Sequence, residues 1–181
     1  MTAPTLLADS TEPNLIPRRF AQQPNGVMGY FNGDYAWPPG EFARWPRWTR
    51  IGVRPLRLDP AAATVRELDV ERGDASPADF PPFYQARKRP NHNAQAICYC
   101  DRSTVPLVAA ALLRQLGQPA LDGTLWHIAA PGWTAGPAAL LAEIVRLYGG
   151  PKIDLSMVWA IQDRFMGTYD VSTVYGQPRW V

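Results

Sequence analysis

The chain has 181 residues, of which 46% are hydrophobic and 19% charged, with a net charge of +2 at pH 7. These values predict one folded domain and exclude an intrinsically disordered chain. The small net charge without a basic run argues against nucleic-acid binding, and the sequence has no stretch of about 18 apolar residues that could span a membrane. We expect no signal peptide, so action outside the cell would need another route, such as lysis or assembly into a particle.

Residues 1–26 are polar, contain prolines and show no sustained hydrophobic period. They are predicted to form an extended N-terminal arm that is ordered only against a partner. The folded domain is then expected to span residues 27–181.

Strands and helices alternate through the rest of the chain. In chain order, strands are predicted over 27–32, 50–54, 64–71, 96–100, 124–129, 157–162 and 169–174. A short helix is expected over 41–45, and longer helices over 77–89, 104–116 and 137–148. This alternation predicts an α/β fold with mostly parallel strands, and a single-domain β/α barrel matches it better than a nucleotide-binding fold, because no glycine-rich phosphate motif is present.

Two carboxylates stand two residues apart at the end of the third predicted strand. Strand alternation places Asp69 and Glu71 on one face, about 6–7 Å apart. Such a pair suits chemistry that needs one protonated and one ionised carboxyl group. From the local pattern alone, an exposed edge strand with two solvated acids is an equally good interpretation.

Other polar residues follow the predicted strands, where β/α barrels carry their chemistry. Asn32, Asp101 and Asp163 fall at strand ends, whereas Asp170 begins the last strand and would need a short strand or a bend to reach the same mouth. His127, between Trp126 and Ile128, is expected to be a packed, hydrogen-bonded histidine and not a base.

Four motifs stand in order along the chain: Leu68-Asp69-Val70-Glu71, Tyr99-Cys100-Asp101-Arg102-Ser103-Thr104, Leu125-Trp126-His127-Ile128-Ala129, and Ala160-Ile161-Gln162 followed by Tyr169-Asp170-Val171-Ser172. Together they resemble the Asp-x-Glu strand, the tyrosine strand end, the Trp-x-x-Ala strand and the closing Gln…Asp pattern of the family 25 glycoside hydrolases. These are lysozyme-type muramidases with a flattened β/α barrel. The likeness is greatest to the shortened versions in actinobacteria and their phages, and it covers roughly residues 27–175.

The resemblance implies cleavage of bacterial peptidoglycan, with Glu71 as the general acid. It implies that Asp69 and Asp170 position substrate, stabilise positive charge at the sugar or aid attack. No cofactor is implied, and no metal is expected, because the carboxylates are not accompanied by a histidine cluster. The candidate substrate-binding residues are Tyr30, Asn32, Asp34, Tyr99, Asp101, Trp126 and Gln162.

The sequence departs from the family at two points. Asn32, with Asp34 in the following loop, stands where the family's first strand carries an aspartate. One strand, over 50–54, is predicted before the Asp-x-Glu strand where the family has two, so the barrel is expected to be shortened or incomplete. The alternative function is therefore a catalytically inactive cell-wall-binding or structural module, such as a minor tail protein of a phage, tethered to neighbouring virion subunits through residues 1–26.

Overall fold

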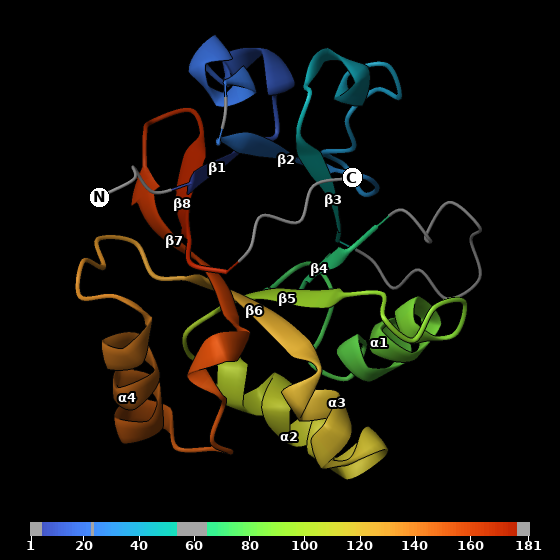
Figure 1. Ribbon diagram of the computed structural model, residues 1–181, viewed down its shortest axis with the longest axis vertical. Coiled ribbons are helices and arrows are strands. Elements are labelled where there is room, and N and C mark those ends of the chain that lie inside the picture. Colours follow the sequence, from blue (N-terminus) through green and yellow to red (C-terminus); the bar gives the residue numbers. More distant parts are fainter. Residues whose placement is uncertain (1–4, 23, 54–64, 177–181) are drawn as a thin grey trace.

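The computed structural model describes residues 5–22, 24–53 and 65–176. These residues form a closed barrel of eight strands whose spatial order follows the chain (Figure 1). The strands are β1 (Thr5–Asp9), β2 (Gly26–Tyr30), β3 (Trp48–Gly52), β4 (Glu67–Asp69), β5 (Ala96–Asp101), β6 (Thr124–Ala129), β7 (Val158–Phe165) and β8 (Asp170–Val174). The strand ends predicted at Arg54 and Thr64, and the last five residues of the predicted domain, lie outside the described residues.

The helices lie around the barrel. The α-helices are α1 (Phe80–Lys88), α2 (Val105–Leu116), α3 (Gln118–Asp122) and α4 (Pro137–Tyr148), and short 3-10 helices span Pro13–Leu15, Arg18–Ala21, Phe42–Arg44 and Leu155–Met157. Both α2 and α4 have proline in the first turn and end at a glycine with positive φ, Gly117 and Gly149, as expected for helix boundaries. Among the described helices, none combines the length and the hydropathy of a membrane-spanning segment.

The barrel contains both parallel and antiparallel strand pairs. It is closed and has eight strands, so the prediction of a shortened or incomplete barrel is wrong. Neighbouring strands from β1 to β7 pair in parallel, whereas β8 runs antiparallel to both β7 and β1 and closes the ring. Asp170 is the first residue of β8 and therefore lies at the end of the barrel where the parallel strands finish. Asp170 reaches this end because β8 runs antiparallel to β1 and β7, and not because the chain bends there.

The prediction of an extended arm over residues 1–26 is wrong. Thr5–Asp9 forms β1, which pairs with β2 on one side and β8 on the other, and Leu7 and Ala8 are fully buried. Its three adjacent apolar residues, Leu6, Leu7 and Ala8, do not alternate with polar ones, so they show no period of 2 in the sequence. Its structure depends on hydrogen bonds to residues more than 150 positions away, which no local pattern reveals.

Two different layers cover the outside of the barrel. The α-helices gather beside β4 to β7 (Figure 1), and a cluster of buried side chains including Leu68, Leu112 and Trp126 fills the space beneath them. On the side of β1 and β2, a second cluster contains Phe20, Trp37 and other aromatic residues of the connecting segments. Both layers hold the wall of the barrel in place without closing its end.

Candidate active site

The end of the barrel where the parallel strands finish carries a group of carboxyl side chains. Asp9, Asp69 and Asp101 are the last residues of β1, β4 and β5, and Asp170 is the first residue of the antiparallel β8. Glu71 follows two residues after Asp69. The strand directions thus bring together acids that are distributed over most of the chain.

All of these acids except Asp9 border an open cleft of about 530 Å³. Its lining includes Tyr30, Asp69, Glu71, Asp74, Tyr99, Asp101, Arg102, Gln162 and Asp170. A second hollow of about 410 Å³ is lined by Asp9 and by residues of the β7–β8 connection, and it shares Thr11, Tyr30 and Asp170 with the first. The two hollows adjoin, so the end of the barrel offers space for an elongated ligand.

Burial strongly raises the pKa of two of these carboxyl groups. The pKa of Asp69 rises to about 9, first because of burial and then because of nearby Glu71 and Asp74. The pKa of Asp9 rises to about 7, through burial and then the charge of Asp170. The Oδ1 atoms of Asp9 and Asp69 are buried and accept no hydrogen bond from the described residues. The site therefore retains protons on carboxyl groups near neutral pH.

Glu71 and Asp170 are more exposed than Asp69 and Asp9. Burial, followed by the charges of Asp101 and Asp74, raises the pKa of Glu71. Burial also raises the pKa of Asp170, while a hydrogen bond with Gln162 acts in the opposite direction. Both groups face the cleft, where they can exchange protons with a bound ligand.

Asp101 has a different environment. Its carboxylate accepts hydrogen bonds from the backbone and hydroxyl groups of Ser103 and Thr104 at 2.6–3.0 Å. Burial acts to raise its pKa, but these hydrogen bonds outweigh burial and lower the pKa. Asp101 is therefore an ionised group that fixes the turn between β5 and α2, and it lines the cleft in this state.

A hydrogen-bonded pair of side chains holds the floor of the cleft. The Tyr99 hydroxyl donates to Gln162 Oε1 at 2.5 Å, and the Gln162 side chain bonds Asp170. Tyr30, on the neighbouring part of the rim, bonds Asp9. Tyr30, Tyr99, Asp101 and Gln162, which the sequence predicted as substrate-binding residues, all line the cleft.

Three predicted site residues do not reach the cleft. Trp126 is fully buried in the cluster between the barrel and the α-helices, because its side chain points outward from β6. Asn32 uses its side-chain oxygen to accept a 2.8 Å hydrogen bond from Val53 N, which ties the loop after β2 to the end of β3. Asp34 is exposed in the same loop and lines neither hollow.

The prediction missed Asp9. The available signal was a short apolar run, Leu6-Leu7-Ala8, ending in an acid, but polar neighbours and the later prolines concealed it. Because residues 5–9 form the first strand, the residue at the end of that strand is Asp9 and not Asn32.

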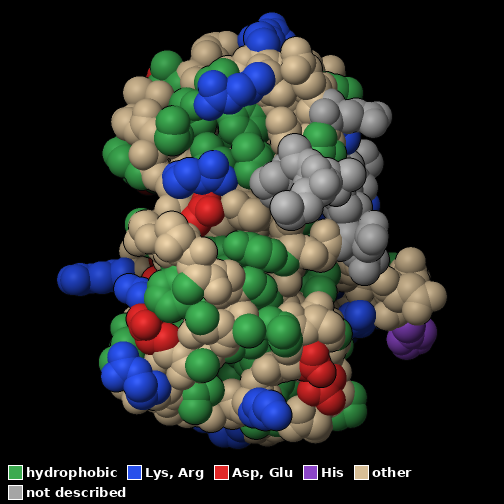
Figure 2. All heavy atoms as spheres, turned by 60° about the vertical axis from the view of Figure 1, so that its left-hand side comes forward, with side chains coloured by type: hydrophobic (Ala, Val, Ile, Leu, Met, Phe, Trp, Pro, Cys, Tyr) green, Lys and Arg blue, Asp and Glu red, His purple; other side chains and the backbone are tan. Residues whose placement is uncertain are grey.

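A separate hollow lies among the helices. It measures about 740 Å³, shares no lining residue with the cleft, and is lined mainly by apolar residues of α2, α4 and the segment after α4. Figure 2 shows hydrophobic side chains over both halves of one face of the molecule, including the lower half, which carries α4 in Figure 1. Its lining holds Lys152 and Asp154 at the margin but no cluster of acids, so the cleft at the barrel end is the better candidate for chemistry.

Among the described residues, no group of three or more histidine, cysteine, aspartate or glutamate side chains is arranged to hold a metal ion. A scan against models of protein families finds no match, and a search of curated proteins also finds none. One similar solved structure is the 1.07 Å crystal structure of an uncharacterised protein of B. stearothermophilus, with a TM-score of 0.40 and 10% sequence identity. The alignment covers 94% of this chain and 96% of that one. A likeness at this level does not assign a family.

Proposed function

We propose that the protein is a glycoside hydrolase of the muramidase type that cleaves the glycan strands of bacterial peptidoglycan. The observation that carries this proposal is the meeting of Asp69, Glu71 and Asp170 around one open cleft at the end of the barrel. Glycoside hydrolysis needs a protonated carboxyl group on one side of the scissile bond and an ionised one near the sugar ring.

The strand count supports the same proposal. With β1 as the first strand, an aspartate stands at its end, and two strands, β2 and β3, precede the strand that carries Asp69. Both features agree with the family 25 glycoside hydrolases, and both depend on Thr5–Asp9 being the first strand of the barrel. We therefore interpret the mixed barrel as a β/α barrel of that type.

The environments of the acids suggest their roles. Glu71 lines the cleft with a raised pKa and would donate its proton to the leaving oxygen as the glycosidic C–O bond breaks. Asp170, bonded by Gln162 and half exposed, would be the ionised carboxylate that stabilises positive charge at the sugar. Water then adds to the anomeric carbon, and its proton returns to a carboxylate of the site. Asp69, whose pKa is about 9, would remain protonated at neutral pH and position Glu71.

The alternative is a catalytically inactive module that binds cell wall or serves as a phage tail component. Three of the sequence features that favour it are the absent first-strand acid, the shortened barrel and the N-terminal arm. Asp9, the closed ring of strands and β1 now remove that support. Action on the cell wall from a virion, or after lysis, remains compatible with the hydrolase proposal.

The test is release of reducing ends from purified peptidoglycan. We expect turnover by the unmutated protein, a loss of about 10²-fold or more in Glu71→Gln, and unchanged turnover in Asp34→Asn, an exposed acid outside the cleft. If the unmutated protein gives no turnover on several wall types between pH 4 and 9, the hydrolase proposal is wrong. Binding to the wall without turnover would then support the alternative.

A further inference from the structure

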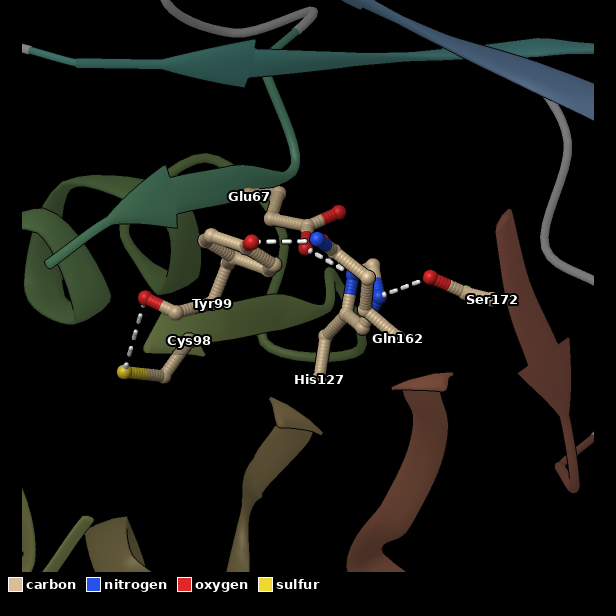
Figure 3. A network of polar contacts seen from close by, with 6 residues as sticks. All are labelled: Glu67, Cys98, Tyr99, His127, Gln162 and Ser172. Carbon is tan, nitrogen blue, oxygen red and sulfur yellow. Dashed lines mark hydrogen bonds and ion pairs between the residues drawn. The ribbon is translucent and has the colours of Figure 1, made fainter. Parts of the chain in front are cut away.

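A chain of polar side chains connects β4, β6 and β8 inside the barrel (Figure 3). His127 Nδ1 on β6 lies 2.6 Å from Glu67 Oε1 on β4, and His127 Nε2 lies 2.7 Å from Ser172 Oγ on β8. All three side chains are fully buried. Glu67 and Ser172 stand two residues deeper than Asp69 and Asp170 on their strands, so the chain forms the layer below the acids of the cleft.

Aromatic rings fix the imidazole from its sides. Tyr99 meets it edge-on, with ring centroids 4.9 Å apart, and Trp159 does so at 5.7 Å. Tyr99 is also the residue that bonds Gln162 in the cleft. A change at His127 therefore reaches the cleft through packing as well as through charge.

The surroundings of the ring provide a hydrogen-bonding partner for each of its two nitrogens. The titratable and polar groups that face it are Glu67 on β4, Tyr99 on β5, Ser172 on β8, Asp9 at the end of β1 and Glu71 beyond β4. A buried carboxylate without a cation is strongly destabilising. An imidazolium gives Glu67 a charge-assisted hydrogen bond and still finds an acceptor for its second N–H in the Ser172 hydroxyl.

We propose that His127 is a positioning residue, held inside the barrel as an imidazolium, and that the Glu67–His127 pair adds to burial and the neighbouring acids in setting which carboxyl groups of the cleft carry protons. The consequence for catalysis rests on the proposed hydrolase function, but the charge of His127 does not.

The two ends of the pair act in opposite directions on the acids of the cleft. After burial, Glu71 and Asp74, the charge of Glu67 adds to the causes that raise the pKa of Asp69. The positive charge of His127 opposes the effect of burial on the pKa of Asp9 and Glu71. The charge of Glu67 also raises the pKa of Asp9, but its effect is smaller than the opposite effect of His127. The pair thus favours a proton on Asp69 and an ionised Asp9, which separates the roles of acids that lie close together.

The first test measures the charge directly. The chain has two histidines, so a protein labelled with ¹⁵N in histidine shows two imidazole rings, and His92→Gln assigns them. We expect protons on both ring nitrogens of His127 at pH 7, with the exposed His92 as the internal reference. A neutral His127 with one protonated nitrogen overturns the proposal, and this result requires neither substrate nor turnover.

The second test follows the carboxyl groups by ¹³C NMR titration. In Glu67→Gln we expect the pKa of Asp69 to fall, and in His127→Gln we expect the pKa of Asp9 to rise, each by about one unit. Circular dichroism and thermal unfolding show whether each variant is folded; if neither folds, the ¹⁵N measurement on the unmutated protein decides. Unchanged pKa values in the folded variants overturn the proposal. A confirmed imidazolium in a protein without turnover would separate failure of the hydrolase function from failure of this inference.

Discussion

Asp9 lies directly opposite Asp170, where the antiparallel strand β8 closes the barrel against β1. Acids at directly paired positions destabilise a sheet, and here one of them is almost completely buried. The pKa of Asp9 accordingly rises from 3.8 to about 7, through burial first and Asp170 second. Closure of the barrel thus concentrates acids at its mouth at the expense of stability, which is typical of a functional site.

Replacing Asp9 should stabilise the protein at alkaline pH. Because its pKa is higher in the folded state, its contribution to stability is fully present below about pH 4 and declines as the pH rises to about 7. A shift of about three units corresponds to at most about 4 kcal/mol. Asp9→Asn should therefore raise the free energy of unfolding at pH 8 and weaken its dependence on pH. Urea unfolding at pH 4.5 and 8 measures the free energy of unfolding and its dependence on pH. The same pH dependence in the unmutated protein and in Asp9→Asn would contradict the raised pKa of Asp9.

The hydrolysis rate should persist above the ordinary titration range of carboxyl groups. Glu71 must be protonated to donate, and its pKa is raised by burial, Asp101 and Asp74, so activity should fall only as the pH exceeds this raised value. The measurement is the rate of reducing-end release as a function of pH. Asp34→Asn is the control and should leave the profile unchanged. Loss of activity between pH 4 and 5 would show that Glu71 is not the proton donor.

Removing the Tyr99 hydroxyl should loosen the floor of the cleft. Tyr99→Phe leaves Gln162 without its 2.5 Å hydrogen bond and frees the amide that bonds Asp170. We expect a loss of about 1 kcal/mol in stability together with a lower kcat. Urea unfolding and kinetics on peptidoglycan test this. The matched control is Tyr175→Phe, because Tyr175 is exposed and lies outside both hollows. Equal effects of the two substitutions would contradict a role of the Tyr99 hydroxyl in holding Gln162.

Asp101 should stabilise the start of α2. In Asp101→Ala the backbone and hydroxyl groups of Ser103 and Thr104 lose their acceptor, and loss of such a turn costs about 1–2 kcal/mol. Because hydrogen bonds outweigh burial and lower the pKa of Asp101, its contribution should disappear as the pH falls through the folded pKa. Thermal unfolding at pH 7 and pH 3 checks this. A larger effect at pH 3 than at pH 7 would contradict it.

Gly29 should not tolerate a side chain. A Cβ atom there would lie 2.5 Å from Trp37 and 2.6 Å from Phe42, which pack against β2 from outside the barrel. Gly29→Ala should therefore destabilise the protein by about 1–3 kcal/mol through overpacking. Gly40→Ala is the control, because no atom lies within 4 Å of the added Cβ. Urea unfolding of both variants is the measurement, and equal stabilities would show that the aromatic cluster can move aside.

The sequence by itself determined the elements that have a strong local signal. The periods of 2 and 3.6 residues located the strands from β2 to β8 and the helices α1, α2 and α4 to within a few residues. The alternation in Leu68-Asp69-Val70-Glu71 predicted that both acids share a face, and both line the cleft. Similarly, His127 was expected to be packed and hydrogen-bonded, and this is confirmed.

Only the tertiary structure decided the direction of β8, the existence of β1 and the location of the first acid. A strand's direction and register are set by hydrogen bonds to its neighbours, and the partners of β1 lie both nearby, in β2, and at the far end of the chain, in β8. The same closure brings Asp9 to Asp170 and places Glu67, His127 and Ser172 in one buried line. Hydrophobic periodicity reports which face of an element is buried, but it contains no information about which distant element that face will meet.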